Sequence, residues 1–406
     1  MLKISLHNLE ARKEPKVFLA AKTILEKRLG QESADWHFLK LATENPASSF
    51  LSLLPHISQY SNGLVIGIGG SDLGTRAIYS ALTLQKPPQR PLYFAGDSLI
   101  PQELLKDLKK FNEKDTLPII VSKSGTTLET LTAFNFLWQR YPLKKAVVIT
   151  DKESPLWQLA LKKGFFTLQF PKNVGGRYSV LSTSALFAIA FAGYKIEAIL
   201  NGAQKALSHL REALKEEASL WQEPACLLAV SHFLALSQHR QNIAVLALYG
   251  NALEPLGNWW RQLWAESLGK NGRGQTPIVA VMPRDQHSQL QLYLDGPADK
   301  IYTFLRVNHY QDETLNELQP LPSPLKRKSL TGILDALFLG TTGALFKKGR
   351  PLLILETEEL NQEFLGEFFL SYEIACALLG ELLKINPFSQ EAVEAGKKIS
   401  RSLLFK

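Results

Sequence analysis

Residues 122–127 carry side chains that suit the binding of a phosphate group. They read Ser-Lys-Ser-Gly-Thr-Thr, so four hydroxyl groups and one ammonium group lie close together along the chain. Gly125 has no Cβ and lets a ligand approach the backbone. The groups that could donate hydrogen bonds to phosphate oxygens belong to Ser122, Lys123, Ser124, Thr126 and Thr127. A second interpretation stays open, because Ser and Thr are also common helix N-caps, although a cap needs only one hydroxyl.

This polar stretch lies where a strand is expected to turn into a helix. The apolar run Leu117 to Val121 predicts a buried strand, and the apolar residues of Leu128 to Trp138 fall at helical spacing. The free N–H groups and the positive end of the helix dipole at such a junction favour an anion. The Gly-Lys-Ser/Thr ending of a nucleotide P-loop is absent, so the pattern indicates a phosphate monoester rather than a nucleotide.

A glycine-rich turn follows an earlier predicted strand. The run Leu64 to Ile68 leads directly into Gly69-Gly70-Ser71-Asp72-Leu73-Gly74. Its glycines permit a tight turn and a close approach of the backbone to a ligand. Asp72 stands where G-x-G-x-x-G has its third glycine, which argues against a dinucleotide site. The alternative is a plain tight connection between strand and helix.

Two charged residues have the right chemistry for a proton-transfer site. Arg177 follows Gly175 and Gly176, and a guanidinium is always charged and can stabilise an oxyanion. Glu266 lies near the end of an apolar, aromatic helix, where burial would raise the pKa of a carboxyl group and suit it to act as a general base. Gln262 lies four residues earlier on the same helix face. The alternatives are a structural arginine that pairs with a carboxylate and an ordinary surface glutamate.

His287 is the remaining candidate for proton transfer. It follows the predicted strand Ile278 to Val281 in an expected loop, and a histidine there can move protons near neutral pH. Neither H-E-x-x-H nor paired-cysteine spacing occurs, so we predict no metal site. The two cysteines, Cys226 and Cys376, lie far apart in apolar contexts and are expected to be buried thiols in a reducing cytoplasm.

Composition restricts the class of protein and of partner. The chain has 406 residues, a net charge of +8 and a pI near 9.2, which suggests two or three domains and an anionic ligand. Its basic residues are scattered, with short clusters only at 106–110 and 326–328, so nucleic-acid binding is not expected. No signal peptide and no apolar run of membrane-spanning length is evident, and we expect a cytoplasmic protein.

The order of the predicted elements indicates an α/β fold with two doubly wound parallel sheets. Apolar strands alternate with amphipathic helices in both halves of the chain. The expected strands are 63–69, 91–95, 117–121, 146–150, 165–170, 243–248, 278–281, 300–306 and 351–356. We expect a helical N-terminal arm over residues 1–45, subdomains over 46–200 and 201–385, and a C-terminal turn and helix over 386–406.

Five stretches together resemble the glucose-6-phosphate isomerase family, in its compact bacterial form. They are Ile66–Gly74, Val121–Thr130, Val174–Ser179, Gln262–Ser267 and Asn386–Lys397, and they occur in the family's order. The resemblance covers most of the chain from about residue 45. It implies two sugar-isomerase (SIS) subdomains and the interconversion of D-glucose 6-phosphate and D-fructose 6-phosphate, a step of glycolysis and gluconeogenesis. It also implies ring opening, proton transfer through a cis-enediol(ate), no cofactor, and a homodimer.

The resemblance also implies roles for individual residues. Ser122, Ser124 and Thr127 would hold the phosphate, with Lys123 and Thr126 in the same loop, and Gly70 and Ser71 would lie at the sugar. Glu266 would be the base and Arg177 would stabilise the intermediate. Gln262 and Gln390 would lie near the sugar, Lys397 at the ring oxygen, and His287, which helps to open the ring, would come from the neighbouring subunit. Ser389 and Ala392 depart from the family pattern, so the geometry of the loop before Lys397 is the weakest of these inferences.

Two other functions stay open at this point. A non-catalytic SIS protein that senses a sugar phosphate would keep residues 122–127 but would not need Glu266, Arg177 and His287, all of which are present. An isomerase of another sugar phosphate, such as mannose 6-phosphate, would differ only in the shape of its pocket.

Overall fold

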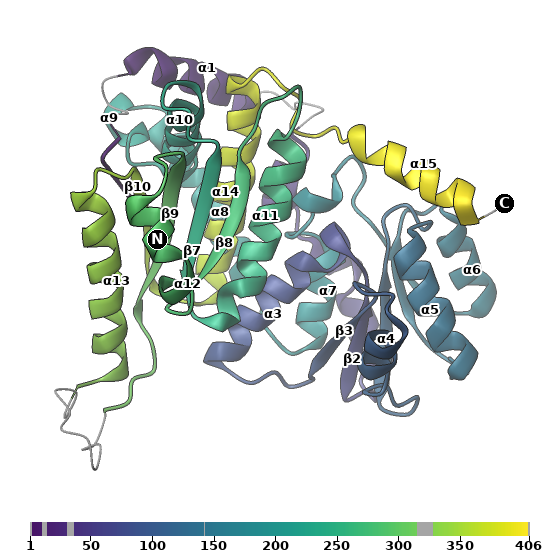
Figure 1. Ribbon diagram of the computed structural model, residues 1–406. Helices are drawn as coiled ribbons and strands as arrows, with labels where there is room; N and C mark the ends of the chain where they lie inside the picture. The colour runs from purple at the N-terminus through teal and green to yellow at the C-terminus, as the bar shows by residue number, and fades with distance from the viewer. Residues whose placement is uncertain (1, 10–13, 31–35, 142, 315–327, 405–406) are drawn as a thin grey trace.

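The computed structural model describes residues 2–9, 14–30, 36–141, 143–314 and 328–404 (Figure 1). Within this part of the chain, the strands form two five-stranded sheets, and helices cover both sheets and fill the space between them. The predicted α/β class with two parallel-sheet subdomains is confirmed. The boundaries proposed between the subdomains stay a prediction.

The first sheet is parallel throughout and has the strand order β3-β2-β4-β5-β6. Its strands are β2 (Asn62–Ile66), β3 (Leu92–Ala95), β4 (Thr116–Val121), β5 (Val147–Thr150) and β6 (Phe166–Gln169). All five were predicted from apolar runs. The order reverses between β2 and β4, because the chain leaves β2 toward one edge of the sheet and leaves β4 toward the other.

Helices cover both faces of the first sheet. They are α3 (Leu73–Gln85), α4 (Pro101–Leu108), α5 (Leu128–Arg140), α6 (Pro155–Lys163) and α7 (Thr183–Phe191). Apolar side chains of α4, α5 and α6 form one core against Ile66, Ile120 and Val148. On the opposite face, α3 and α7 pack over Val65 and Ile119 and belong to the large core that the two sheets share.

The second sheet has the order β1-β10-β9-β7-β8. It contains β7 (Ile243–Tyr249), β8 (Thr276–Met282), β9 (Lys300–His309) and β10 (Leu352–Glu359), all parallel, and β1 (Lys3–His7), which pairs antiparallel with β10. The helical arm predicted from residue 1 is therefore wrong for residues 3–7. These five residues become an edge strand because β10 offers a free row of backbone groups.

Six longer helices accompany the second sheet. They are α8 (Ile196–Ala213), α10 (Pro224–Ser237), α11 (Glu254–Leu268), α12 (Gln286–Asp295), α13 (Leu330–Lys347) and α14 (Gln362–Leu382). Side chains of α8, α10, α11 and α14 join the shared core, whereas α12 and α13 cover the outer face through residues such as Tyr293 and Phe338. The shared core thus fixes α11 between the two sheets, next to α3 (Figure 1).

The helices α8 and α14 pack very closely on each other. A Cβ on Gly202 would overlap the carbonyl oxygen of Glu363, and a Cβ on Gly366 would overlap that of Ile199. Only glycine at these two positions allows the helix backbones to approach so closely. Any larger residue at either position would push the two helices apart.

The helix α13 was not predicted, and much of its outward face is apolar. Leu330, Leu337, Leu339 and Phe346 are exposed, whereas Phe338 packs against Tyr249 and Phe304. Among the described residues, α13 is the one helix with the length and hydropathy of a candidate membrane span. A core or interface helix of a globular protein meets the same criteria, so this is weak evidence for a membrane.

Further helices lie near the two ends of the chain and in the connections. They include α1 (Pro15–Gly30), α2 (Phe38–Thr43), two 3₁₀ helices (Pro46–Ser49 and Leu51–Ile57), α9 (Glu217–Leu220) and α15 (Ala392–Leu404). The predicted C-terminal turn and helix are confirmed. Cys226 and Cys376 are free, buried thiols, as expected.

Candidate active site

The two loops singled out in the sequence follow the two strands at which the first sheet reverses its order. Residues 67–74 leave the carboxyl end of β2, and residues 122–127 leave the carboxyl end of β4, its direct neighbour. The connections diverge from this point, and the crevice that they leave is where open α/β sheets bind ligands. The topology thus brings both candidate loops to one location.

The loop 122–127 has the geometry of an anion site. Ser122 is buried and its hydroxyl donates to Thr127 Oγ1 over 3.0 Å, while the Thr126 hydroxyl donates to Ser124 Oγ over 3.0 Å. Thr127 is the N-cap residue of α5, but its side chain makes no capping hydrogen bond. Gly125 has φ +62°, and a Cβ there would lie 2.5 Å from Ser154 Oγ. The first N–H groups of α5 therefore face the loop without the side-chain cap that the alternative interpretation requires.

This loop contacts the segment that carries Arg177. Lys123 Nζ donates to the carbonyl oxygen of Val174 over 3.0 Å. The Ser179 hydroxyl donates to Gly176 O over 2.8 Å and reaches Gly70 O at 3.5 Å. Residues 174–179 therefore lie between the two loops of the crevice. The hydrogen bond from Lys123 connects the loop 122–127 to this segment.

The glycine-rich loop also packs directly on the arginine segment. A Cβ on Gly70 would lie 2.8 Å from the amide nitrogen of Arg177 and closer still to the carbonyl group of Gly176. On the far side of the loop, Arg76 Nε donates to Asp72 Oδ2 over 2.5 Å. Burial raises the pKa of Asp72 to about 6, an effect that the neighbouring Arg76 opposes. The glycine-rich loop thus has contacts at two points: Gly70 packs on residues 176–177, and Asp72 pairs with Arg76.

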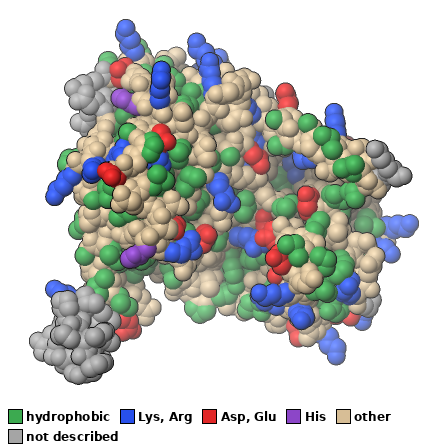
Figure 2. Space-filling model, viewed as in Figure 1, with side chains coloured by type: hydrophobic (Ala, Val, Ile, Leu, Met, Phe, Trp, Pro, Cys, Tyr) green, Lys and Arg blue, Asp and Glu red, His purple; other side chains and the backbone are tan. Residues whose placement is uncertain are grey.

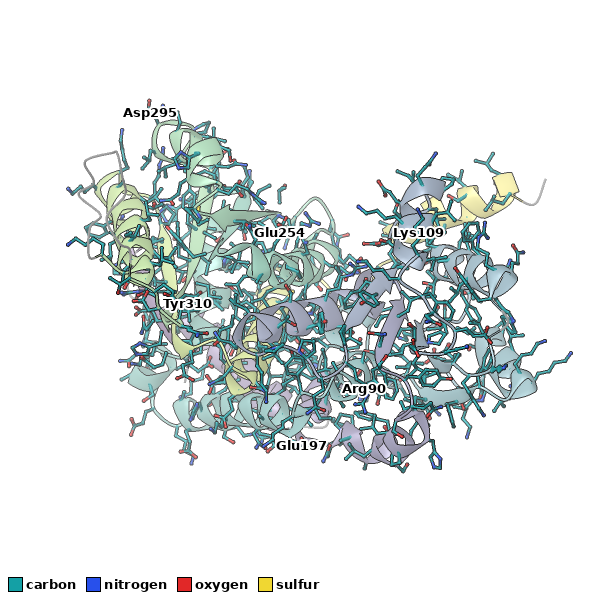
Figure 3. All side chains as sticks on the ribbon, turned by 90° about the horizontal axis from the view of Figure 1, so that it is seen from below. Arg90, Lys109, Glu197, Glu254, Asp295 and Tyr310 are labelled. Carbon is teal, nitrogen blue, oxygen red and sulfur yellow. The ribbon has the colours of Figure 1, made fainter. Side chains whose placement is uncertain are left out.

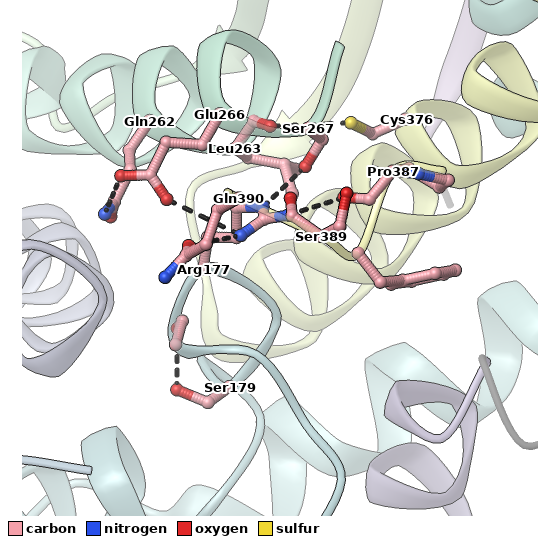
Figure 4. Close-up of polar contacts among 12 residues, drawn as sticks. Arg177, Ser179, Gln262, Leu263, Glu266, Ser267, Cys376, Pro387, Ser389 and Gln390 are labelled. Atoms are coloured by element: carbon pink, nitrogen blue, oxygen red, sulfur yellow. Dashed lines mark hydrogen bonds and ion pairs between the residues drawn. The ribbon is translucent and has the colours of Figure 1, made fainter. Parts of the chain in front are cut away.

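Glu266 lies in the last turn of α11 and has polar neighbours (Figure 4). Its Oε1 accepts a hydrogen bond from Gln262 Nε2 over 3.0 Å, and its Oε2 lies 3.6 Å from Nη1 of Arg177. The predicted shared face of Gln262 and Glu266 is confirmed. The apolar surroundings expected for the carboxylate are not found, because about a third of this side chain is exposed. A Cβ on Gly69 would lie 2.9 Å from Gln262 Nε2, so α11 closes the crevice beside the glycine-rich loop.

The buried guanidinium of Arg177 connects its own segment to α11 and to residues 387–390 (Figure 4). Its Nε donates to Ser267 Oγ over 2.7 Å and its Nη1 to Gln390 Oε1 over 2.8 Å. Its Nη2 donates to the carbonyl oxygens of Pro387 and Ser389 over 2.5 and 3.1 Å. The contact with Glu266 is longer than any of these hydrogen bonds. The second N–H of Nη1 therefore has the weakest partner of the five and is the donor most free to bind a ligand.

A cavity of about 560 Å³ opens beside Glu266. Its lining residues are Ala265, Glu266, Gly269, Lys270, Asn271, Asn386, Ser389, Gln390, Glu391, Ala392 and Val393. The loop that departs from the family pattern is thus one wall of this cavity. It is anchored by the contacts of Arg177 and by Phe388, whose ring packs at 5.1 Å on that of Tyr178.

Two predicted site residues do not contact these groups in the described chain. His287 is the second residue of α12 and is exposed, so the expected loop there is wrong. Lys397 is exposed on α15 and pairs with Glu394 over 2.7 Å. The sequence analysis did not single out Ser267, which accepts a hydrogen bond from Arg177, or Lys270, which donates to the carbonyl groups of Glu266 and Ser267. Within the described residues, no group of three or more His, Cys, Asp and Glu side chains could hold a metal ion.

Comparison with known proteins identifies the family of this chain. The family model for phosphoglucose isomerase matches residues 57–282. A probable glucose-6-phosphate isomerase of Methanococcus maripaludis is 35% identical over 92% of this chain and 85% of its own length. The glucose-6-phosphate isomerase of Rubrobacter xylanophilus is 38% identical over 82% of this chain and 80% of its own.

Solved structures resemble the chain over most of its length. A hypothetical protein from Thermus thermophilus has a TM-score of 0.85 at 29% identity, with 99% of both chains covered. A glucose-6-phosphate isomerase from Chlamydia trachomatis matches with a TM-score of 0.76, and the match covers 91% of this chain and 78% of that protein's chain. Because the two sequences are only 23% identical, this likeness supports the fold alone. From the matched family model and these relatives, we conclude that the chain belongs to the phosphoglucose isomerase family.

Proposed function

We infer that this chain is an aldose–ketose isomerase that interconverts D-glucose 6-phosphate and D-fructose 6-phosphate. Besides family membership, one observation supports this inference: Glu266 is paired with Arg177, and the segment that carries Arg177 contacts Lys123 of the candidate anion loop 122–127. Aldose–ketose isomerisation requires a base, a positive group near the developing oxyanion, and a means of fixing the substrate. The crevice offers all three.

We propose that the phosphate binds at the start of α5. The hydroxyls of residues 122–127 and the first N–H groups of the helix would donate to its oxygens, and the helix dipole would favour its charge. Binding energy from the phosphate, which does not react, would hold the sugar carbons in place. Gly70, Ser71, Gln262 and Gln390 would line the sugar.

In the open-chain sugar, Glu266 would remove the proton from the carbon next to the carbonyl group. The electrons of that C–H bond then form the C1–C2 double bond of the enediol(ate), and the carbonyl oxygen takes the negative charge. The Nη1 group of Arg177, whose contact with Glu266 is the longest polar contact that the guanidinium makes, would stabilise this oxyanion. The hydroxyl proton on O2 then passes to the charged O1, and Glu266 returns the carbon proton to C1. These two transfers leave a carbonyl group at C2 and a hydroxyl group at C1, which completes the isomerisation.

We propose that a second copy of the chain supplies His287 for ring opening. His287 is exposed on α12, and the neighbouring Gln286 donates to Leu337 O of α13 over 3.2 Å. The exposed side chains of Leu292, Leu337 and Leu339 give this surface the apolar character of an interface. We also propose that Lys397 reaches the ring oxygen in the working enzyme.

The expected cellular location is the cytoplasm. Two free thiols, Cys226 and Cys376, support a reducing compartment. On the face seen in Figure 2, the Lys and Arg side chains are scattered and do not gather in one patch, which supports a small anionic substrate over a nucleic acid.

Replacing the base is the direct test of this function. Glu266→Gln keeps the size of the side chain and the contact with Gln262 but removes the base, so kcat for glucose 6-phosphate should fall by roughly 10³-fold with KM little changed. Glu254→Gln is the matched control. It lies at the other end of α11 (Figure 3) and pairs with Arg284 on the surface, so its activity should match that of the wild type.

The alternatives give different results in the same assay. A sensor would bind glucose 6-phosphate without turnover by the wild-type protein. An isomerase of another sugar phosphate would prefer mannose 6-phosphate over glucose 6-phosphate. Activity that survives in Glu266→Gln would assign the base to another residue.

Mixing two inactive variants tests the shared site. Co-expression of Glu266→Gln with His287→Ala yields mixed dimers in which one site combines an intact Glu266 with an intact His287. Since half of the dimers are mixed and half of their sites are intact, activity should return to about a quarter of the wild-type level. No recovery, or a monomer in analytical ultracentrifugation, would contradict the proposal.

A further inference from the structure

Lys270 lies against the catalytic segment, and the mechanism above does not use it. It is the second residue after α11, and its ammonium donates to the carbonyl oxygens of Glu266 over 3.0 Å and of Ser267 over 2.7 Å. The last carbonyl groups of a helix have no partner within the helix and lie at the negative end of its dipole. A lysine that folds back onto them satisfies two of these groups and fixes the last turn.

The two residues that Lys270 holds are parts of the site. Glu266 carries the carboxylate, and Ser267 accepts the hydrogen bond from Arg177 Nε. A movement of this turn would therefore displace both the base and the arginine that faces it. A displacement of about 1 Å at a reacting group is enough to cost roughly 100-fold in rate.

The ammonium also contributes charge to the cavity. Lys270 lines it together with Glu266, Gln390 and Glu391. An ammonium has three N–H donors, and two of them are bound to the carbonyl groups, so most of its hydrogen-bonding capacity is used to fix the turn.

We propose that Lys270 is a positioning residue for the isomerase reaction: its ammonium fixes the turn that carries Glu266, and it must be charged for the site to be active. This inference rests on the proposed function. It assigns a role to a residue that neither the sequence motifs nor the resemblance had marked.

The surroundings of Lys270 make this role dependent on pH. Burial, and then the positive charge of Arg177, lower the pKa of Lys270 to about 8, while Cys376, Glu266 and Glu391 oppose that shift. These groups come from all the segments that enclose the ammonium: residues 174–179, α14, α11 itself and residues 386–391. The ammonium is thus charged at pH 7 and loses its proton as the pH rises through about 8, so activity should fall there.

The test is the pH profile of kcat and of kcat/KM for the wild type, Lys270→Arg, Lys270→Met and the surface control Lys348→Met. Lys270→Met should lose roughly 10- to 100-fold in kcat at pH 7 with KM changed by less than about 3-fold. Lys270→Arg keeps its charge at every pH of the assay, so it should retain most of kcat and lose the decline above pH 8. Lys348→Met should match the wild type.

Each contrary result has a separate meaning. A kcat of Lys270→Met equal to that of the wild type, or a decline in Lys270→Arg that superimposes on the wild-type profile, would overturn the role of Lys270. If thermal melting shows that Lys270→Met is unfolded, the pH profile of Lys270→Arg still tests whether the charge on Lys270 controls activity. A wild-type protein without isomerase activity would overturn the proposed function, and this inference with it.

Discussion

The two sheets of the molecule are wound alike, yet they contribute to the site in different ways. Counted within each sheet, the first four parallel strands have the order 2-1-3-4 in both: β3-β2-β4-β5 and β8-β7-β9-β10. Only the fifth position differs, because the parallel strand β6 completes the first sheet and the antiparallel strand β1 completes the second. By topology alone, both sheets have a crevice at the same point.

The residues at these equivalent points are opposite in character. After β4 the chain reads Ser-Lys-Ser-Gly-Thr-Thr, whereas after β9 it reads Tyr-Gln-Asp-Glu-Thr. A hydrogen bond from the Thr331 hydroxyl is the main cause that lowers the pKa of Asp312, in the second of these loops, to about 2. This carboxylate remains ionised at any physiological pH and would repel a phosphate. The second crevice therefore does not repeat the first.

The second sheet contributes a helix instead of its strand ends. The helix α11 follows β7 as α3 follows β2, and the two helices pack on each other. Its last two turns bring Gln262, Glu266 and Ser267 next to the glycine-rich loop and the arginine segment. The comparison indicates that a repeated fold need not repeat its chemistry: in the proposed mechanism, one half of the chain binds the phosphate and the other half supplies the base.

The largest effect should come from breaking the contact between the glycine-rich loop and the arginine segment. In Gly70→Ala, the new Cβ must displace the backbone of Gly176 and Arg177, and kcat/KM should fall by roughly 10²- to 10³-fold. Gly340→Ala is the control in the other half, because a Cβ there meets no atom within 4 Å. Circular dichroism should show both variants folded. A Gly70→Ala variant with wild-type kcat/KM would show that the close contact does not position Arg177.

A feature of the fold or the site could be predicted from the sequence when its pattern is contained within a few neighbouring residues. Buried parallel strands are near-continuous apolar runs, so the runs at Leu64, Ile119 and Val148 could be identified without a structure. The anion loop could also be found, because its hydroxyls, its glycine and its helix start are adjacent along the chain. Both signals are complete within a few residues.

The remaining features depend on residues that are far apart in sequence. The segment Lys3–His7 is a strand only because β10 lies beside it. Arg177 is held by Pro387 and Ser389, more than two hundred positions away, and no spacing rule could identify that pairing. His287 was expected in a loop because the short helix α12 has a weakly periodic pattern. Lys270 lacks any motif, and only the folded-back ammonium reveals it.

A smaller effect should sharpen the contrast between the two crevices. Ser122→Ala removes one buried hydroxyl from the anion loop and leaves Thr127 Oγ1 without its donor, so KM for glucose 6-phosphate should rise roughly 10-fold, the cost of one hydrogen bond to a charged group. Because Glu266 is untouched, kcat should change by less than about 3-fold. Asp312→Asn, in the equivalent loop of the second sheet, should leave KM unchanged.

Titration calorimetry with glucose 6-phosphate and with glucose shows whether the phosphate group is what the loop binds. The Ser122→Ala variant should lose affinity for the phosphate ester, whereas any binding of glucose should be unaffected. If KM increases in Asp312→Asn, or does not increase in Ser122→Ala, the phosphate does not bind at the loop after β4. The proposed difference between the two loops would then be wrong.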